Sequence, residues 1–338
     1  MNKKLADILK FVIFLGIGIF FVWWFLLKLD ADEKAAIWSS FLSARWGWVA
    51  VVMLVSLLSH FIRAMRWKLL FKPLHHNPGL NNTFGAVMVT YLANLAFPRL
   101  GEVMRCAMLR TSEKIPLEKS LGTVVTERLI DVLMFVVIVL LGFLLMFSSV
   151  KDFIYDSLSQ KFSTLPSLGV IAAAGVALLA ILFAAYKLFH KKLMNLSLYR
   201  KVVELIMGCI DGVKSILHLG PKATVLFLTY SILIYFLYIC GGWVILQAFG
   251  ETSHLGFATA FVIYLFGSVG MMISQGGLGA YPVLVWQALA LYGIAETTSL
   301  ACGWLLWSSQ QLLVLVVGLA YLVYFSLLKK KSHEEEKS

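Results

Sequence analysis

The sequence predicts an all-α, polytopic membrane protein with about six full spans and two re-entrant hairpins that enter from opposite sides. Of its 338 residues, 60% are hydrophobic and only 14% are charged. Soluble domains are nearer half apolar and about a quarter charged. Several apolar runs also reach the roughly 20 residues that cross a bilayer as a helix. Strand-type alternation is absent, so the composition favours helices over a β-barrel.

The N-terminal 30 residues predict the first span. A basic start is followed by a long apolar run that ends in Trp23-Trp24, and no small-residue cleavage site follows closely. We therefore expect an uncleaved span rather than a removed signal peptide. The four cysteines are scattered without a C-x-x-C pair, so the sequence predicts neither a disulfide framework nor a zinc site.

The distribution of Lys and Arg predicts the orientation. If the N-terminus is cytoplasmic and the irregular regions 83–97 and 257–292 return to the side they came from, cytoplasmic segments hold 23 of the 29 basic residues. This asymmetry predicts cytoplasmic termini in the plasma or inner membrane, and it explains the net charge of +11 without nucleic acid. The six predicted spans are 11–27, 48–62, 121–147, 168–189, 223–248 and 299–327, and 198–218 reads as an amphipathic surface helix.

The first irregular region, 83–97, is too short to be an ordinary span. It has fifteen residues between Asn81-Asn82 and Pro98, and a lone crossing would place the basic residues of 98–119 outside. We therefore predict a hairpin that enters from the cytoplasm and turns near Pro98.

The second irregular region, 257–292, contains no Lys or Arg and turns through the glycine-rich segment 274–282. It would enter from the outside. Two full spans would leave the charge distribution unchanged, so a total of eight spans stays open. Leu100-Gly101 also aligns with Leu278-Gly279, which suggests a weak inverted repeat. Inverted-repeat transporters form their sites at broken helices near the midplane.

The charges of the first hairpin suggest a phosphate site. Arg99, Glu102 and Arg105 are spaced i, i+3, i+6 and lie near one helical face. A buried charge needs a partner, and Arg offers a planar fork of donors that suits phosphate. Pro98 and Gly101 would open the backbone, and the helix start would add N–H groups that favour an anion. The alternative is a cytoplasmic loop with snorkelling arginines.

Two further clusters are open to a structural and a functional interpretation. Glu127 and Asp131 share a helical face with Arg128 beside them, and they either cap the helix at the interface or line a cavity with Arg99 or Arg105. Arg63 and Arg66 follow a span directly. They either anchor it as inside charges or act as a cytoplasmic gate for a headgroup.

Motifs for catalysis, metals and nucleotides are missing. His75-His76 has no ligand at metal spacing, 274–282 lacks the Lys of a P-loop, and neither H-E-x-x-H nor G-x-S-x-G occurs. We expect no enzyme activity, no metal and no cofactor.

Four segments together resemble the lysylphosphatidylglycerol synthase transmembrane family, also called flippase-like membrane proteins. They are "RAMRWKLLF", "YLANLAFPRLGEVMRCAMLR", "TERLIDVL" and "QGGLGAY", in this order. The hairpin signature N-x-x-x-P-x-R-x-G-E-x-x-R is fairly specific and is supported by E-R-x-x-D. In this chain the residues of the hairpin signature are Asn94, Pro98, Arg99, Gly101, Glu102 and Arg105. The residues of the E-R-x-x-D element are Glu127, Arg128 and Asp131.

The resemblance implies two opposed hairpins around a central cavity and movement of a phospholipid between leaflets. The aminoacyl transferase domain of the full-length synthases is missing, so synthase activity does not carry over. The chain departs from many relatives at the second hairpin, where Gln275 replaces a proline before the glycines and Ala280-Tyr281 follows them in place of a glutamate.

The leading hypothesis is a flippase for a phosphate-bearing, anionic or aminoacylated lipid, with a single domain over 1–328 and a charged tail over 329–338. The alternatives are an integral-membrane lipid transferase, or an accessory or scaffold subunit of a lipid-synthesis enzyme. The expected substrate-binding residues are Asn94, Arg99, Glu102, Arg105, Glu127, Arg128, Asp131, Arg63 and Arg66. The expected hairpin and gate residues are Pro98, Gly101, Gln275, Gly276, Gly277, Gly279 and Tyr281.

Overall fold

The computed structural model describes residues 31–96, 100–145 and 219–335. These ranges contain nine α-helices, two short 3-10 helices and no strand, which confirms the predicted all-α class. Four predicted features lie outside the described residues: the spans 11–27 and 168–189, the amphipathic segment 198–218, and the turn residues Pro98 and Arg99.

Three helices in the described part of the chain are long and apolar enough to cross a membrane. The first contains α3 (Trp46–Leu69), the second coincides with α10 (Pro221–Leu246), and the third covers residues 296–328 of α13 (Glu296–Glu335). At 1.5 Å per residue, even α3 rises about 36 Å, more than the roughly 30 Å of a hydrocarbon core. They correspond to the predicted spans 48–62, 223–248 and 299–327. Helix α6 (Leu117–Leu145) is continuous over nearly all of the predicted span 121–147.

Two helical segments were not predicted. Helix α2 (Ala31–Ser43) precedes α3, where the sequence suggested only a loop. Its "ADEKAA" start is rich in strong helix formers, so local propensity accounts for it. Helix α13 continues beyond residue 328 to Glu335, through the segment that we expected to be a separate tail.

Each irregular region contains two consecutive helices. The first consists of α4 (Leu80–Ala96) and α5 (Leu100–Glu113), preceded by a 3-10 turn at Lys72–Leu74. The second consists of α11 (Phe257–Ile273), the 3-10 turn η2 (Gln275–Gly277) and α12 (Ala280–Ala290). The 11 residues of α12 rise only about 16 Å, too little to cross alone. Whether the two regions are re-entrant hairpins or full spans stays a prediction.

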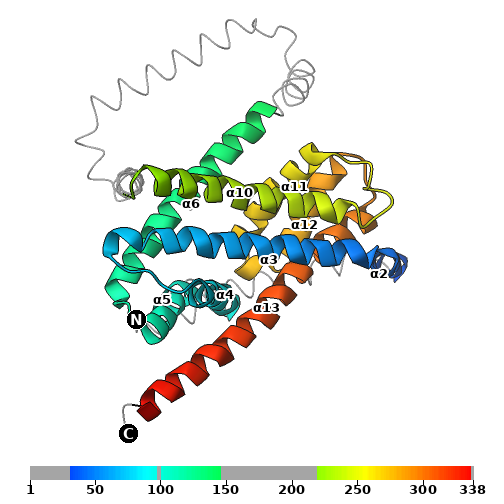
Figure 1. Ribbon diagram of the computed structural model, residues 1–338. Coiled ribbons are helices and arrows are strands. Elements are labelled where there is room, and N and C mark those ends of the chain that lie inside the picture. The colour runs from blue at the N-terminus through cyan, green and yellow to red at the C-terminus, as the bar shows by residue number, and fades with distance from the viewer. Residues whose placement is uncertain (1–30, 97–99, 146–218, 336–338) are drawn as a thin grey trace, which may run out of the picture. The chain divides into compact units, whose positions relative to one another are not determined.

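The chain divides into two compact units. In the first unit, residues 1–127 and 216–338, α3 lies along α10, and α13 packs against α2, α3, α4 and α12 (Figure 1). The second unit comprises residues 128–215, of which the structure describes the remainder of α6, 128–145.

The core of the first unit joins the start of α3 to α10, α12 and α13. Val52, Ile245, Val285, Leu289 and Cys302 are fully buried there. In contrast, α13 exposes a row of large apolar side chains beyond this core, including Val316, Leu319, Val323 and Leu327. An apolar surface of this kind on a long helix is expected where the solvent is lipid.

Candidate functional site: a buried arginine cluster

One carboxylate, that of Glu127 on α6, binds three arginines. Its Oε1 accepts hydrogen bonds from Nη1 of Arg63 at 3.2 Å and from Nη2 of Arg66 at 3.0 Å. Its Oε2 accepts a hydrogen bond from Nη1 of Arg105 at 2.7 Å. The side chains of Arg66 and Glu127 are fully buried, and those of Arg63 and Arg105 are 6% and 1% exposed. We call these four residues the arginine cluster.

The arginine cluster is assembled from three helices. Arg63 and Arg66 are i, i+3 on α3 and so point to one side of that helix. Arg105 comes from the middle of α5, in the first hairpin, and Glu127 from α6. Because both side chains are buried, Arg63 and Arg66 are not the surface anchors that the positive-inside alternative suggested. Whether they contact substrate stays a prediction.

Two neutral residues of α10 also bind the arginines of α3. Nη2 of Arg63 donates to the hydroxyl of Tyr238 at 3.1 Å, and Nη1 of Arg66 donates to Oγ of Ser231 at 3.2 Å. These two partners were not predicted. They lie seven positions apart on one face of α10, but that helix also carries other hydroxyl-bearing residues, so the sequence did not single them out.

Arg105 is held by an aromatic ring as well as by Glu127. Its guanidinium lies over the ring of Trp67 at 4.5 Å from the centroid. Trp67 is fully buried, and its Nε1 donates to Oγ1 of Thr123 at 2.9 Å. In the part of the chain that the structure describes, nothing accepts a hydrogen bond from Nε or Nη2 of Arg105. A buried guanidinium with two unused donor atoms can receive an anionic oxygen ligand.

In the first hairpin, the side chain of Asn94 on α4 accepts a hydrogen bond from the start of α5. Oδ1 of Asn94 accepts a hydrogen bond from the backbone N–H of Gly101 at 2.9 Å. A Cβ atom on Gly101 would collide with the carbonyl oxygen of Thr90, so this glycine permits close packing of α5 on α4. At this position the expectation of a helix-start N–H available to an anion is wrong, because Asn94 occupies it. Glu102 is half-buried in the first turn of α5.

The second hairpin meets the first at its tip. Nε2 of Gln275 donates to the carbonyl oxygen of Asn94 at 2.6 Å. The carbonyl oxygen of Gly276 accepts hydrogen bonds from Nε1 of Trp307 at 2.7 Å and Nε2 of Gln311 at 3.4 Å. Two predicted hairpin segments 181 residues apart are thus in direct contact. This contact is expected if the hairpins enter from opposite sides.

The glycines of the second tip are required by its backbone. Gly276, Gly277 and Gly279 have φ values of 60°, 77° and 73°, in the left-handed region that glycine adopts without steric penalty. Tyr281 follows the tip but is only 9% exposed, and its ring packs against the backbone at Gly267. It therefore belongs to the core of the second hairpin, while a gating role for the tip stays a prediction.

The remaining predicted site residues lie in the second unit. Nη1 of Arg128 and Oδ2 of Asp131 form an ion pair at 3.8 Å along α6, with Arg128 38% exposed. Their participation in a cavity with the arginine cluster stays a prediction. Among the described residues, no group of three or more His, Cys, Asp or Glu could hold a metal ion.

A comparison with protein-family models assigns the chain. The model described as the lysylphosphatidylglycerol synthase TM region matches residues 8–327. The protein belongs to this family. Comparisons with curated proteins and with solved structures give no significant match. With its long apolar helices, the family assignment identifies an integral membrane protein related to lipid synthesis or lipid flipping.

Proposed function

We propose that the protein moves a phosphate-bearing lipid between the two leaflets of the membrane and holds its headgroup at the arginine cluster. The observation that carries this proposal is that Arg105 is buried with two hydrogen-bond donor atoms unused. Its guanidinium is 1% exposed, and its Nε and Nη2 have no acceptor among the described residues. Burial without a hydrogen-bond acceptor is costly for a polar group, and a phosphate oxygen is a suitable acceptor for this edge of the fork.

The surroundings of Arg105 hold its guanidinium in a fixed orientation, which suits reversible binding of an anion. Glu127 holds one nitrogen of the fork, Nη1, and Trp67 covers one face of the guanidinium, so its orientation is fixed before a ligand arrives. Arg63 and Arg66 share the same carboxylate and add positive charge within the site. A preorganised cluster loses little conformational entropy on binding. Glu127 is thus the residue that keeps three arginines together.

The hairpins suggest how the lipid would pass. Arg105 lies on the second helix of the first hairpin, whose tip contacts the tip of the second hairpin through Asn94 and Gln275. Separation of these tips would open a path past the cluster. No nucleotide motif occurs in the sequence, so movement would be passive, exchange-type or ion-coupled.

The test is lipid movement in proteoliposomes that contain labelled phosphatidylglycerol, a labelled neutral lipid and a labelled polyprenyl phosphate. Wild type is compared with Arg105→Ala and with Arg105→Lys, which keeps the charge but not the fork. We expect Arg105→Ala to slow movement of the phosphate-bearing lipids about tenfold or more, because a hydrogen bond to a charged group contributes about 1.5–3 kcal/mol. Arg105→Lys should recover only part of the loss.

Arg110→Ala is the matched control, since Arg110 lies on the same helix and is exposed. It should move lipids at the wild-type rate. Unchanged movement in Arg105→Ala, with the protein folded, would show that the cluster is structural. Equal movement of the neutral lipid by wild type would exclude phosphate recognition.

A further inference from the structure

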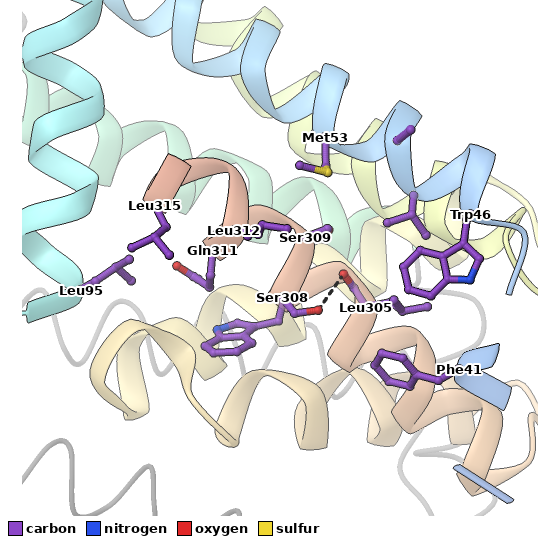
Figure 2. Close-up of a pocket in the computed structure, with 13 residues that line it drawn as sticks. Phe41, Trp46, Met53, Leu95, Leu305, Ser308, Ser309, Gln311, Leu312 and Leu315 are labelled. Atoms are coloured by element: carbon purple, nitrogen blue, oxygen red, sulfur yellow. Dashed lines mark hydrogen bonds between the residues drawn. The ribbon is translucent and has the colours of Figure 1, made fainter. Parts of the chain in front are cut away.

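A long groove lies on the first unit away from the arginine cluster. Its volume is about 740 Å³, and it is bounded by the first turns of α3 and the middle of α13. Trp46 and Met53 line it from α3, and Leu305 and Leu312 line it from α13 (Figure 2). Phe41 of α2 closes one end, and Leu95 of the first hairpin lies at the other.

The lining of the groove selects for hydrocarbon. Among the described residues that line it none is charged, and their polar side chains are engaged within the protein. Ser308 and Ser309 donate to the carbonyl oxygens of Leu305 and Leu306, as the dashed line in Figure 2 shows for Ser308. Trp307 and Gln311 donate to Gly276. A ligand here would meet mainly methyl, methylene and aromatic carbon.

The position of the groove identifies the source of that hydrocarbon. Its two long walls, α3 and α13, both belong to helices that can cross a membrane. In the membrane the groove therefore lies where acyl chains are the solvent, and a chain is the apolar molecule available to fill it. Its far end reaches the contact between the hairpins, because Leu95 packs near Gly276.

We propose that this groove binds one acyl chain of a membrane phospholipid. The site deepens the proposed function, on which it rests for the identity of the lipid. A chain in the groove would contact Trp307 and Gln311, the two residues that hold the tip of the second hairpin. The acyl chain would thus enter beside the contact between Asn94 and Gln275, which must open for the lipid to move.

Photolabelling tests the site without requiring lipid movement. The protein is reconstituted in phosphatidylglycerol and phosphatidylcholine with a trace of phosphatidylcholine that carries a diazirine at the end of one chain. After irradiation, labelled positions are mapped by peptide mass spectrometry. We compare groove residues (Leu305, Leu312) with the exposed α13 residues Val316 and Leu319, which lie outside the groove.

The deciding variants are neighbours on α3. Met53→Trp fills the groove, while Leu54→Trp adds the same ring at an adjacent position that is 65% exposed. We expect Met53→Trp to lower labelling of Leu305 and Leu312 about threefold or more, because bulk in the groove excludes methylenes from apolar contact. Labelling of Val316 and Leu319 should not change, and Leu54→Trp should change neither pair.

Ala50→Phe serves as a second filling variant if Met53→Trp does not fold, because Ala50 also lines the groove. Equal groove labelling in Met53→Trp and Leu54→Trp would overturn the proposal. So would a cross-link from a benzophenone at position 53 to residues 1–30 in place of lipid, which would make the protein's own N-terminal segment the occupant. Failure of the arginine cluster to move lipid would leave these labelling outcomes unaffected.

Discussion

The two ends of α3 carry opposite chemistry on the same helical scaffold. Near its start, Trp46 and Met53 line a groove whose described lining residues are all uncharged. Near its end, Arg63 and Arg66 are buried against Glu127. Met53 and Arg63 are ten residues apart, or about 15 Å along the helix. A lipid is likewise divided into an apolar chain and a charged headgroup. One end of α3 suits the chain, and the other end suits the headgroup.

Removal of the central carboxylate should have the largest effect on this comparison. Glu127→Gln leaves Arg63, Arg66 and Arg105 without the carboxylate that all three share. Breaking a buried ion pair in this way costs about 3–5 kcal/mol. We expect a marked fall in the thermal unfolding temperature of the detergent-solubilised protein.

The matched variant is Glu118→Gln, at an exposed position in the first turn of the same helix. It should unfold close to wild type. If Glu127→Gln and Glu118→Gln unfold at the same temperature, the arginine end of α3 is far less dependent on charge pairing than its contacts indicate.

A moderate effect is expected from the aromatic support of Arg105. Trp67→Phe keeps a ring near the guanidinium but loses the hydrogen bond to Thr123. A hydrogen bond of this kind contributes about 0.5–1.5 kcal/mol to stability. A double-mutant cycle with Thr123→Val, read by denaturant or thermal unfolding, should give a coupling energy of about 1 kcal/mol. Strict additivity of the two variants would show that the contact stabilises nothing.

The smallest effect is expected at the groove end. Trp307→Phe leaves a smaller aromatic ring in the groove and removes the hydrogen bond to Gly276, whose carbonyl oxygen retains Gln311. The stability change should stay below about 1 kcal/mol, while amide hydrogen exchange at the tip 275–279 should become faster. Trp304→Phe on the same helix should not alter exchange at the tip. Equal rates of amide hydrogen exchange at the tip in both variants would show that the hydrogen bond from Trp307 does not stabilise the tip.

The sequence predicted much of the fold and part of the site. Apolar run length identified α3, α10 and α13, and the glycines of 276–279 correctly marked the turn of the second hairpin. It also included Arg63, Arg66, Arg105 and Glu127 among nine candidate substrate-binding residues, although in three separate clusters. It could not show that one carboxylate binds three arginines, because that depends on three helices that approach from distant parts of the chain.

Other residues gave little signal before folding. Ser231, Tyr238 and Trp67 look like ordinary residues of apolar helices, and only their contacts with Arg66, Arg63 and Arg105 give them a role. Gly101 was expected to open the backbone, whereas in the structure its missing side chain permits close packing of α5 on α4. Pattern alone does not distinguish these uses of glycine.

The sequence by itself determined the class of the protein, its long apolar helices, the glycine turn of 276–279 and its family. These follow from properties that are local along the chain: apolar run length, helix propensity, glycine and proline positions, and a linear motif. The tertiary structure alone decided which charges are buried together, which carbonyl oxygens hold the hairpin tips, and where a groove remains. Those features depend on distances between helices that are remote in sequence, and helix packing sets those distances.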